Sequence, residues 1–143
     1  VEEIVSILDR TTGTGEARAQ KVADGNQVLA MGRLALGTPI ETALTAYAAR
    51  LVVATHPATP NASPMVKQYV RYGASPRGAQ SLILGGKIHA LLEGRYNVSY
   101  RDIDAVAPSA LRHRILLNFE GMAEGISPDD IIADAIKTVP KGS

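Results

Sequence analysis

The chain contains no cysteine and no tryptophan, and aromatic residues make up only 4% of its 143 residues. Without cysteine it has no disulfide framework, no thiol nucleophile and no thiolate metal site. This composition fits a cytosolic protein. Because aromatic side chains are scarce, the hydrophobic core must be built largely from Leu, Ile, Val and Ala, and such an aliphatic core favours packed helices.

Long apolar runs are missing as well. No stretch approaches the roughly 18 apolar residues that a membrane span needs, and the N-terminus lacks the charged and apolar regions of a signal peptide. We therefore expect a soluble, cytoplasmic protein without a membrane partner. The formal net charge is +1, so overall charge does not drive the chain towards nucleic acid or anionic lipid.

Several catalytic signatures are also absent. The chain has neither the Gly-x-x-x-x-Gly-Lys-Ser/Thr phosphate-binding loop nor the Gly-x-Ser-x-Gly elbow of a serine hydrolase. Asp129 and Asp130 precede an apolar run instead of ending one, which indicates helix capping and not magnesium binding. A zinc site is not expected, because the histidines are far apart without i, i+4 pairing: His56, His89 and His113.

Hydrophobic residues make up 45% of the chain, enough for one domain with a core of moderate size. Apolar periodicity and capping residues predict a mainly α fold, a small helical bundle. The predicted helices cover residues 1–9, part of 17–35, 38–55, 76–93, a helix from Ser99 that Pro108 interrupts, a further helix from Pro108 through Leu111, and 127–139.

Capping signals mark three of these helix starts. Thr38–Glu41 and Ser127–Asp130 each combine a capping residue, a proline and a first-turn carboxylate, and Ser99–Asp102 resembles a capping box. In the middle of the helix at 76–93, the pair Gly85–Gly86 has three interpretations: a close helix crossing, a bend, or drift at a tolerant position.

Between the helices, residues 56–64 are rich in proline and predict a loop, and residues 66–72 predict an extended segment. A short two- or three-stranded β element is compatible with residues 69–72, 97–98 and 114–118. The apolar residues 115–117 fit either a helix or a strand.

The segment Tyr72–Ala79 is the most informative stretch. Ser75 is a strong N-cap candidate and Pro76 suits the first helical position, so Arg77 lies in the first turn of a well-specified helix. Its guanidinium fork matches phosphate oxygens, and the helix N-terminus adds positive potential. The segment therefore predicts a phosphate sensor, and the alternative is an Arg77 that pairs with a nearby carboxylate or lies along the surface.

A basic cluster, Arg112–Arg114, is the best alternative site, with Arg95 and Arg101 upstream of it. It has the charge to contact nucleic-acid phosphates. However, the cluster is short, lacks interleaved aromatic residues and has neighbouring carboxylates that can pair with it. Salt bridges between elements are the favoured interpretation, and nucleic acid is not an expected partner.

Four segments occur together in a known order: Tyr69–Gln80, Leu91–Ser99, Ala107–Pro108 with Leu111–Glu120, and Gly125–Ile132. They resemble the C-terminal lid domain of MoxR-type AAA+ ATPases. The resemblance is close from Tyr69 to the C-terminus and looser from Val1 to about Thr55. One departure is Gly85–Gly86, where many relatives carry alanine.

The resemblance implies a division of the chain. Residues 1–10 would be the trailing helix of an upstream ATPase core, residues 11–16 a linker, and residues 17–140 the helical lid.

The resemblance also implies a site. In the family, the arginine of the Gly-Ala-Ser-Pro-Arg motif is the sensor 2 residue, which maps onto Arg77, with Gly73, Ser75 and Pro76 positioning it. Arg77 would act only in the assembled ATPase, on the nucleotide of its own or of an adjacent subunit.

The expected cofactors are ATP and Mg, bound mainly by the upstream core, and the isolated domain is expected to hold none and to hydrolyse no ATP. The implied partners are that core, neighbouring subunits of a homo-oligomeric ring, and client proteins with von Willebrand factor A domains. The implied function is chaperone-like remodelling or maturation of partner complexes. A helical protein-interaction or oligomerisation module with no nucleotide role is the alternative.

Overall fold

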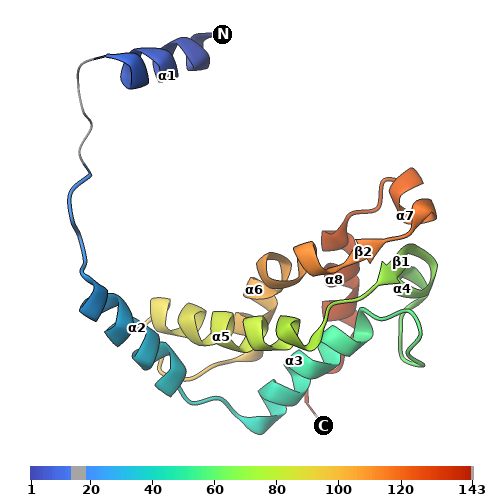
Figure 1. The fold of residues 1–143 in the computed structure, drawn as a ribbon. Helices are drawn as coiled ribbons and strands as arrows, with labels where there is room; N and C mark the ends of the chain where they lie inside the picture. Colours follow the sequence, from blue (N-terminus) through green and yellow to red (C-terminus); the bar gives the residue numbers. More distant parts are fainter. Residues whose placement is uncertain (14–18, 143) are drawn as a thin grey trace. The chain divides into compact units, whose positions relative to one another are not determined.

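The computed structural model describes residues 1–13 and 19–142. The chain divides into two units, Val1–Met31 and Gly32–Ser143, and each is described by itself. The first unit holds α1 (Glu2–Thr12) and the first turns of α2 (Gly25–Gly37), which continues into the second unit (Figure 1).

The second unit holds the remaining elements, in the order α3 (Thr42–Ala54), α4 (Pro64–Tyr69), β1 (Val70–Tyr72), α5 (Pro76–Leu92), α6 (Tyr100–Leu111), the 3-10 turn η1 (Arg112–Arg114), β2 (Leu116–Leu117), α7 (Phe119–Ala123) and α8 (Pro128–Thr138). The strands pair in antiparallel register, with Val70 opposite Leu117 and Tyr72 opposite Leu116. The predicted mainly α fold with a small β element is confirmed.

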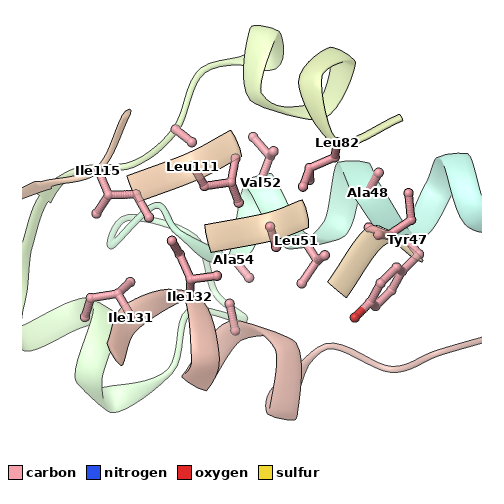
Figure 2. Close-up of a cluster of buried hydrophobic side chains, with 14 of the residues drawn as sticks. Tyr47, Ala48, Leu51, Val52, Ala54, Leu82, Leu111, Ile115, Ile131 and Ile132 are labelled. Atoms are coloured by element: carbon pink, nitrogen blue, oxygen red, sulfur yellow. The ribbon is translucent and has the colours of Figure 1, made fainter. Parts of the chain in front are cut away.

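The core of the second unit is aliphatic, as the composition predicts. Its largest buried side chains come from α3, α5, α6 and α8: Leu51, Leu82, Ile103, Leu111, Ile131 and Ile132. All of them except Ile103 are labelled in Figure 2. The one large aromatic residue among them is Tyr47, which packs edge-to-face on Tyr100 and donates a hydrogen bond to Asp104 Oδ1 at 2.6 Å. Burial, and then this bond to Asp104, raise the pKa of the Tyr47 hydroxyl far above its ordinary value.

Helix α5 packs closely along α6, and Gly85–Gly86 explains how. A Cβ atom at Gly86 would lie 2.7 Å from Ile103 Cδ1, and one at Gly85 would lie 3.2 Å from Val106 Cγ2. Both neighbours belong to α6, so the glycine pair faces that helix. Of the three interpretations of this pair, the structure supports the close crossing.

Two predicted helix starts are confirmed. Ser127 Oγ accepts the Asp130 N–H at 3.2 Å and Asp130 Oδ2 accepts the Ser127 N–H at 2.9 Å, which is a complete capping box. At the start of α6, Asp102 Oδ2 accepts hydrogen bonds from the N–H and the hydroxyl of Ser99.

Two predicted caps need correction. Helix α3 begins at Thr42 with Glu41 in the N-cap position, because Thr38 is buried and its hydroxyl donates to Leu34 O at the end of α2. Ser75 does hold the N-cap position of α5, with Pro76 as the first helical residue. Within the described part of the chain, however, its hydroxyl makes no capping hydrogen bond.

The extended segment predicted at 66–72 is partly wrong. Residues 64–69 form α4, because Ser63 Oγ accepts the Val66 N–H at 3.2 Å and Pro64 occupies the first turn, and the strand begins only at Val70.

The interruption predicted at Pro108 is also wrong. Helix α6 runs through Pro108 to Leu111, and Pro108 has no N–H for Asp104 O, so the helix gives up a single backbone bond there.

The predicted strand segments have different outcomes. Of residues 115–117, Leu116 and Leu117 form β2, so that segment is a strand. Residues 97–98 join neither strand of the described sheet, since Val98 is instead buried in the core. Helix α7 was not predicted, and Asn118 starts it by accepting the Gly121 N–H at 2.9 Å.

In the first unit, α1 extends two residues into the predicted linker. The hydroxyls of Thr11 and Thr12 donate to Ile7 O and Leu8 O, which satisfies them inside the helix. The rest of the linker lies mostly outside the described residues, and the division into core helix, linker and lid stays a prediction. Across residues 1–13 and 19–142, no helix combines the length and hydropathy of a membrane crossing.

The two serines at N-cap positions, Ser127 with a cap bond and Ser75 without one, give a stability prediction. Ser127→Ala should lower the free energy of unfolding by about 1 kcal/mol, because it removes a formed cap. Ser75→Ala should change it by less than about 0.5 kcal/mol, because no cap bond is lost. Urea unfolding of both variants checks the difference, and equal losses would contradict the assignment.

Candidate functional site

Three of the four residues of the predicted site, Ser75, Pro76 and Arg77, lie at the start of α5, and the fourth, Gly73, lies two residues before the N-cap. Ser75 is the N-cap, Pro76 follows it, and Arg77 lies in the first turn, exposed to solvent. Among the described residues, the Arg77 guanidinium has no hydrogen-bond or ion-pair partner. The alternative in which Arg77 pairs with a nearby carboxylate therefore finds no support in this part of the chain, whereas its exposure agrees both with the other alternative, an arginine that lies along the surface, and with a free phosphate sensor.

The backbone just before this turn is held against the end of α3. Ala74 is fully buried, and its N–H donates to Thr55 Oγ1 at 2.9 Å. At Gly73 the two segments approach so closely that a Cβ atom would lie 2.6 Å from Thr55 O. Since a backbone oxygen at that position cannot move aside easily, this close approach requires glycine at position 73.

The carbonyl of Ala74 has a partner from the same region. His56 Nε2 lies 2.8 Å from Ala74 O. Since a carbonyl oxygen only accepts, this nitrogen carries the proton. Thr55 and His56 were not predicted as site residues. They lie 19 and 18 residues before Ala74 in the sequence, and no local motif signals the contact.

Two arginines of the basic cluster, Arg112 and Arg114, bond to other parts of the fold. Arg112 pairs with Asp129 at 2.9 Å, joining η1 to α8. Arg114 donates to Ala110 O at 2.9 Å and to Ser81 Oγ at 3.3 Å. The Arg112–Asp129 pair matches the predicted salt-bridge role, whereas Arg114 bonds to neutral groups and ties η1 to α6 and α5.

A second polar cluster lies at the other end of α5, around the fully buried Asp102. Arg95 donates to both of its carboxylate oxygens, at 2.9 and 2.5 Å, and His89 Nδ1 lies 2.8 Å from Oδ1. The Arg95 guanidinium, helped by Ser99 and His89 and opposed by burial, holds the pKa of the Asp102 carboxyl well below its usual range. This cluster joins the end of α5 to the start of α6. The Ser99–Asp102 box signals part of it in the sequence.

Two of the three histidines thus have structural partners, His56 on Ala74 and His89 on Asp102. In the described ranges, no group of three or more His, Cys, Asp or Glu side chains is arranged to hold a metal ion.

The helical architecture, the Gly73–Arg77 turn and the order of its motifs agree with one family model, the AAA lid domain, which matches residues 62–135. The chain belongs to the AAA lid domain family. Within it, the lid is of the MoxR type. It is 32% identical to Chaperone MoxR1 of Mycobacterium tuberculosis over 127 residues, 89% of this chain and 34% of that protein. It is 40% identical to Protein MoxR of Methylorubrum extorquens over 73 residues, 50% of this chain and 21% of that protein.

A solved structure agrees with the lid along nearly its whole length. The crystal structure of a proposed ATPase from Cytophaga hutchinsonii superposes with a TM-score of 0.83 and 31% identity, covering 99% of this chain and 43% of that one. The chain spans about a third of the length of its curated relative from Mycobacterium tuberculosis.

The Asp102 cluster gives a prediction about pH. Because the folded-state pKa of Asp102 lies below its unfolded value, near 4, its stabilising contribution is complete above that pH. The contribution is lost as the pH falls towards the folded-state pKa. Asp102→Asn should therefore lower the free energy of unfolding by about 2 kcal/mol at pH 7 and flatten the loss of stability below pH 4.

The matched control is Asp129→Asn, which breaks the half-exposed pair with Arg112. It should cost less than about 1 kcal/mol. Urea unfolding between pH 2 and 7 measures both variants. An Asp102→Asn variant as stable and as acid-sensitive as the wild type would contradict the assigned role.

Proposed function

We propose that this domain is the nucleotide-responsive lid of a MoxR-like AAA+ ATPase, in which Arg77 is the sensor 2 residue and contacts the terminal phosphates of ATP. The observation that carries the proposal is the contrast at the start of α5. The backbone before the turn is buried and hydrogen-bonded, whereas the Arg77 guanidinium is exposed without a partner among the described residues. An exposed guanidinium on a held backbone supports a role in ligand binding.

The chemistry of the site fits phosphate. A guanidinium stays charged and presents paired donors to phosphate oxygens, and the N-terminus of a helix adds positive potential at the same point. In phosphoryl transfer, negative charge is spread over the terminal phosphate, and a fixed cation lowers the barrier. Arg77 would bind that phosphate when ATP is present and lose its ligand after hydrolysis, which would release the lid.

The remaining parts of the ATPase lie outside this domain. ATP and Mg would be bound mainly by an upstream core, and the lid would add Arg77 to that site. As in the expectation drawn from the family, Arg77 serves either its own subunit or an adjacent subunit of a homo-oligomeric ring.

We further propose a chaperone-like role in the cytoplasm, in which ATP hydrolysis drives remodelling or maturation of partner complexes. Support comes from the 32% identity to a protein named Chaperone MoxR1. Proteins with von Willebrand factor A domains are the proposed clients.

The test is ATP turnover by the full-length protein with Arg77→Ala. Because one charge-stabilising donor would be lost, kcat should fall by roughly a hundred- to a thousand-fold. Arg101→Ala is the matched control, since Arg101 is also an exposed helical arginine, on α6. It should keep wild-type turnover. Thermal melting and size-exclusion chromatography establish that all variants fold and assemble equally.

Mixing Arg77→Ala subunits with subunits that lack ATPase activity for another reason then separates the two arrangements. Recovery of activity in the mixture indicates action on the neighbouring subunit. Wild-type turnover by Arg77→Ala would refute the sensor role and leave protein interaction as the better account of this domain.

A further inference from the structure

We propose that Thr55 and His56, at the end of α3, form a backbone clamp on Ala74 that positions Arg77 for its ligand. The proposal rests on the proposed function, because it explains how the sensor arginine is held. It adds two positioning residues that act through Arg77 and touch no nucleotide themselves.

The first half of the clamp is the Thr55 hydroxyl. Thr55 is fully buried, and its Oγ1 donates to Val52 O at 2.7 Å within α3. A hydroxyl has one proton, so this bond fixes the orientation of the group and leaves its lone pairs free. One of them accepts the Ala74 N–H at 2.9 Å. Without Thr55 Oγ1, that N–H would be a buried donor with no partner.

The second half is His56. Its Nε2 donates to Ala74 O at 2.8 Å, on the other backbone group of the same residue. Ala74 precedes the N-cap, so neither group belongs to the hydrogen-bond ladder of α5. The side chains of Thr55 and His56 therefore bond to the N–H and the C=O of Ala74, respectively. Together they fix the orientation of the backbone where the chain enters the turn.

Packing beneath the turn reinforces these bonds. Gly73 lies directly against Thr55, where a Cβ atom would come within 2.7 Å of Thr55 Oγ1. On the other side, a Cβ atom at Gly78 would lie 3.4 Å from Ala74 Cβ and 3.4 Å from Val52 Cγ2. The first turn of α5 is thus seated on Ala74 and on the end of α3. A shift of the Ala74 backbone would move this turn and carry Arg77 with it.

The clamp makes Arg77 sensitive to α3. The guanidinium itself has no partner in the described part of the lid, so its position depends on the backbone that carries it. A displacement of about 1 Å at a charge-stabilising group costs up to about a hundred-fold in rate. Loss of the Thr55–Ala74 bond should therefore lower kcat by more than the accompanying loss of folding stability explains.

The test uses full-length protein in four forms: wild type, Arg77→Ala, Thr55→Val and the double variant. Valine matches the shape of threonine but cannot accept the Ala74 N–H. We expect Thr55→Val to lower kcat by about ten-fold or more, and the double variant to turn over no more slowly than Arg77→Ala alone. Thr55→Ser, which keeps the hydroxyl, should restore most of the activity.

A second readout does not depend on activity. Amide hydrogen exchange of residues 74–78 in the nucleotide-free protein should be faster in Thr55→Val and near wild type in Thr55→Ser. If thermal melting shows that Thr55→Val does not fold, the comparison is made at His56. His56→Leu removes the donor to Ala74 O, and His56→Gln retains one. We expect His56→Leu to have the lower turnover and the faster exchange, and His56→Gln to lie near the wild type in both.

Three outcomes overturn the clamp. If the fold-decreases in kcat caused by Thr55→Val and by Arg77→Ala multiply in the double variant, Thr55 acts independently of Arg77. Unchanged turnover in Thr55→Val, while Arg77→Ala is impaired, would mean that the bond has no effect on positioning. Wild-type turnover in Arg77→Ala itself would refute the sensor role, and the positioning role with it, even where exchange at residues 74–78 has changed.

Discussion

The seating of α5 against α3 and α6 is the constraint on which the rest of the lid depends. Its buried positions recur every four residues, at Gly78, Leu82, Gly86 and Ala90. Three of these four residues are small, so the buried ridge of α5 is shallow and the neighbouring helices come close to its backbone. Large side chains at those positions would separate the helices and open the aliphatic core. The small buried residues of α5 and the scarcity of aromatic residues in the chain therefore both allow this close packing of helices.

This seating leaves the two ends of α5 to be fixed by polar groups. At the C-terminal end, Arg95, His89 and the start of α6 converge on the buried Asp102. At the N-terminal end, the bonds from α3 to Ala74 hold the backbone. The side chains of Asp102, Thr55 and His56 are hydrogen-bonded within the fold. Arg77 differs because it follows the held backbone directly and points out of it.

Local signals in the sequence determine much of this arrangement. The starts of α6 and α8 follow from a serine with a carboxylate three residues later, and the start of α5 follows from Ser75 at the N-cap position before Pro76. Predictions failed where one local hydrogen bond competes with another local motif. Thr38 has the sequence of a cap, yet it is buried and bonds backwards to α2. Ser63 caps α4, although the residues after it alternate in the manner of a strand.

The candidate site has one part that is contiguous in the sequence and one part that only the fold brings together. Its linear part, Gly73 to Arg77, is readable because the turn, the cap position and the arginine are adjacent in the sequence. Its spatial part, Thr55 and His56, is not, because a threonine at the end of a helix and a histidine in a loop are unremarkable until the fold brings Ala74 to them. Charge alone does not distinguish the arginines from one another. The sequence places Arg77 in the first turn of a helix and Arg112 and Arg114 near carboxylates, but only the structure assigns Arg95, Arg112 and Arg114 their carboxylate, carbonyl or hydroxyl partners. A guanidinium in such a pair would have to give up an existing bond to bind phosphate, whereas at Arg77 no bond within the described chain competes with the ligand.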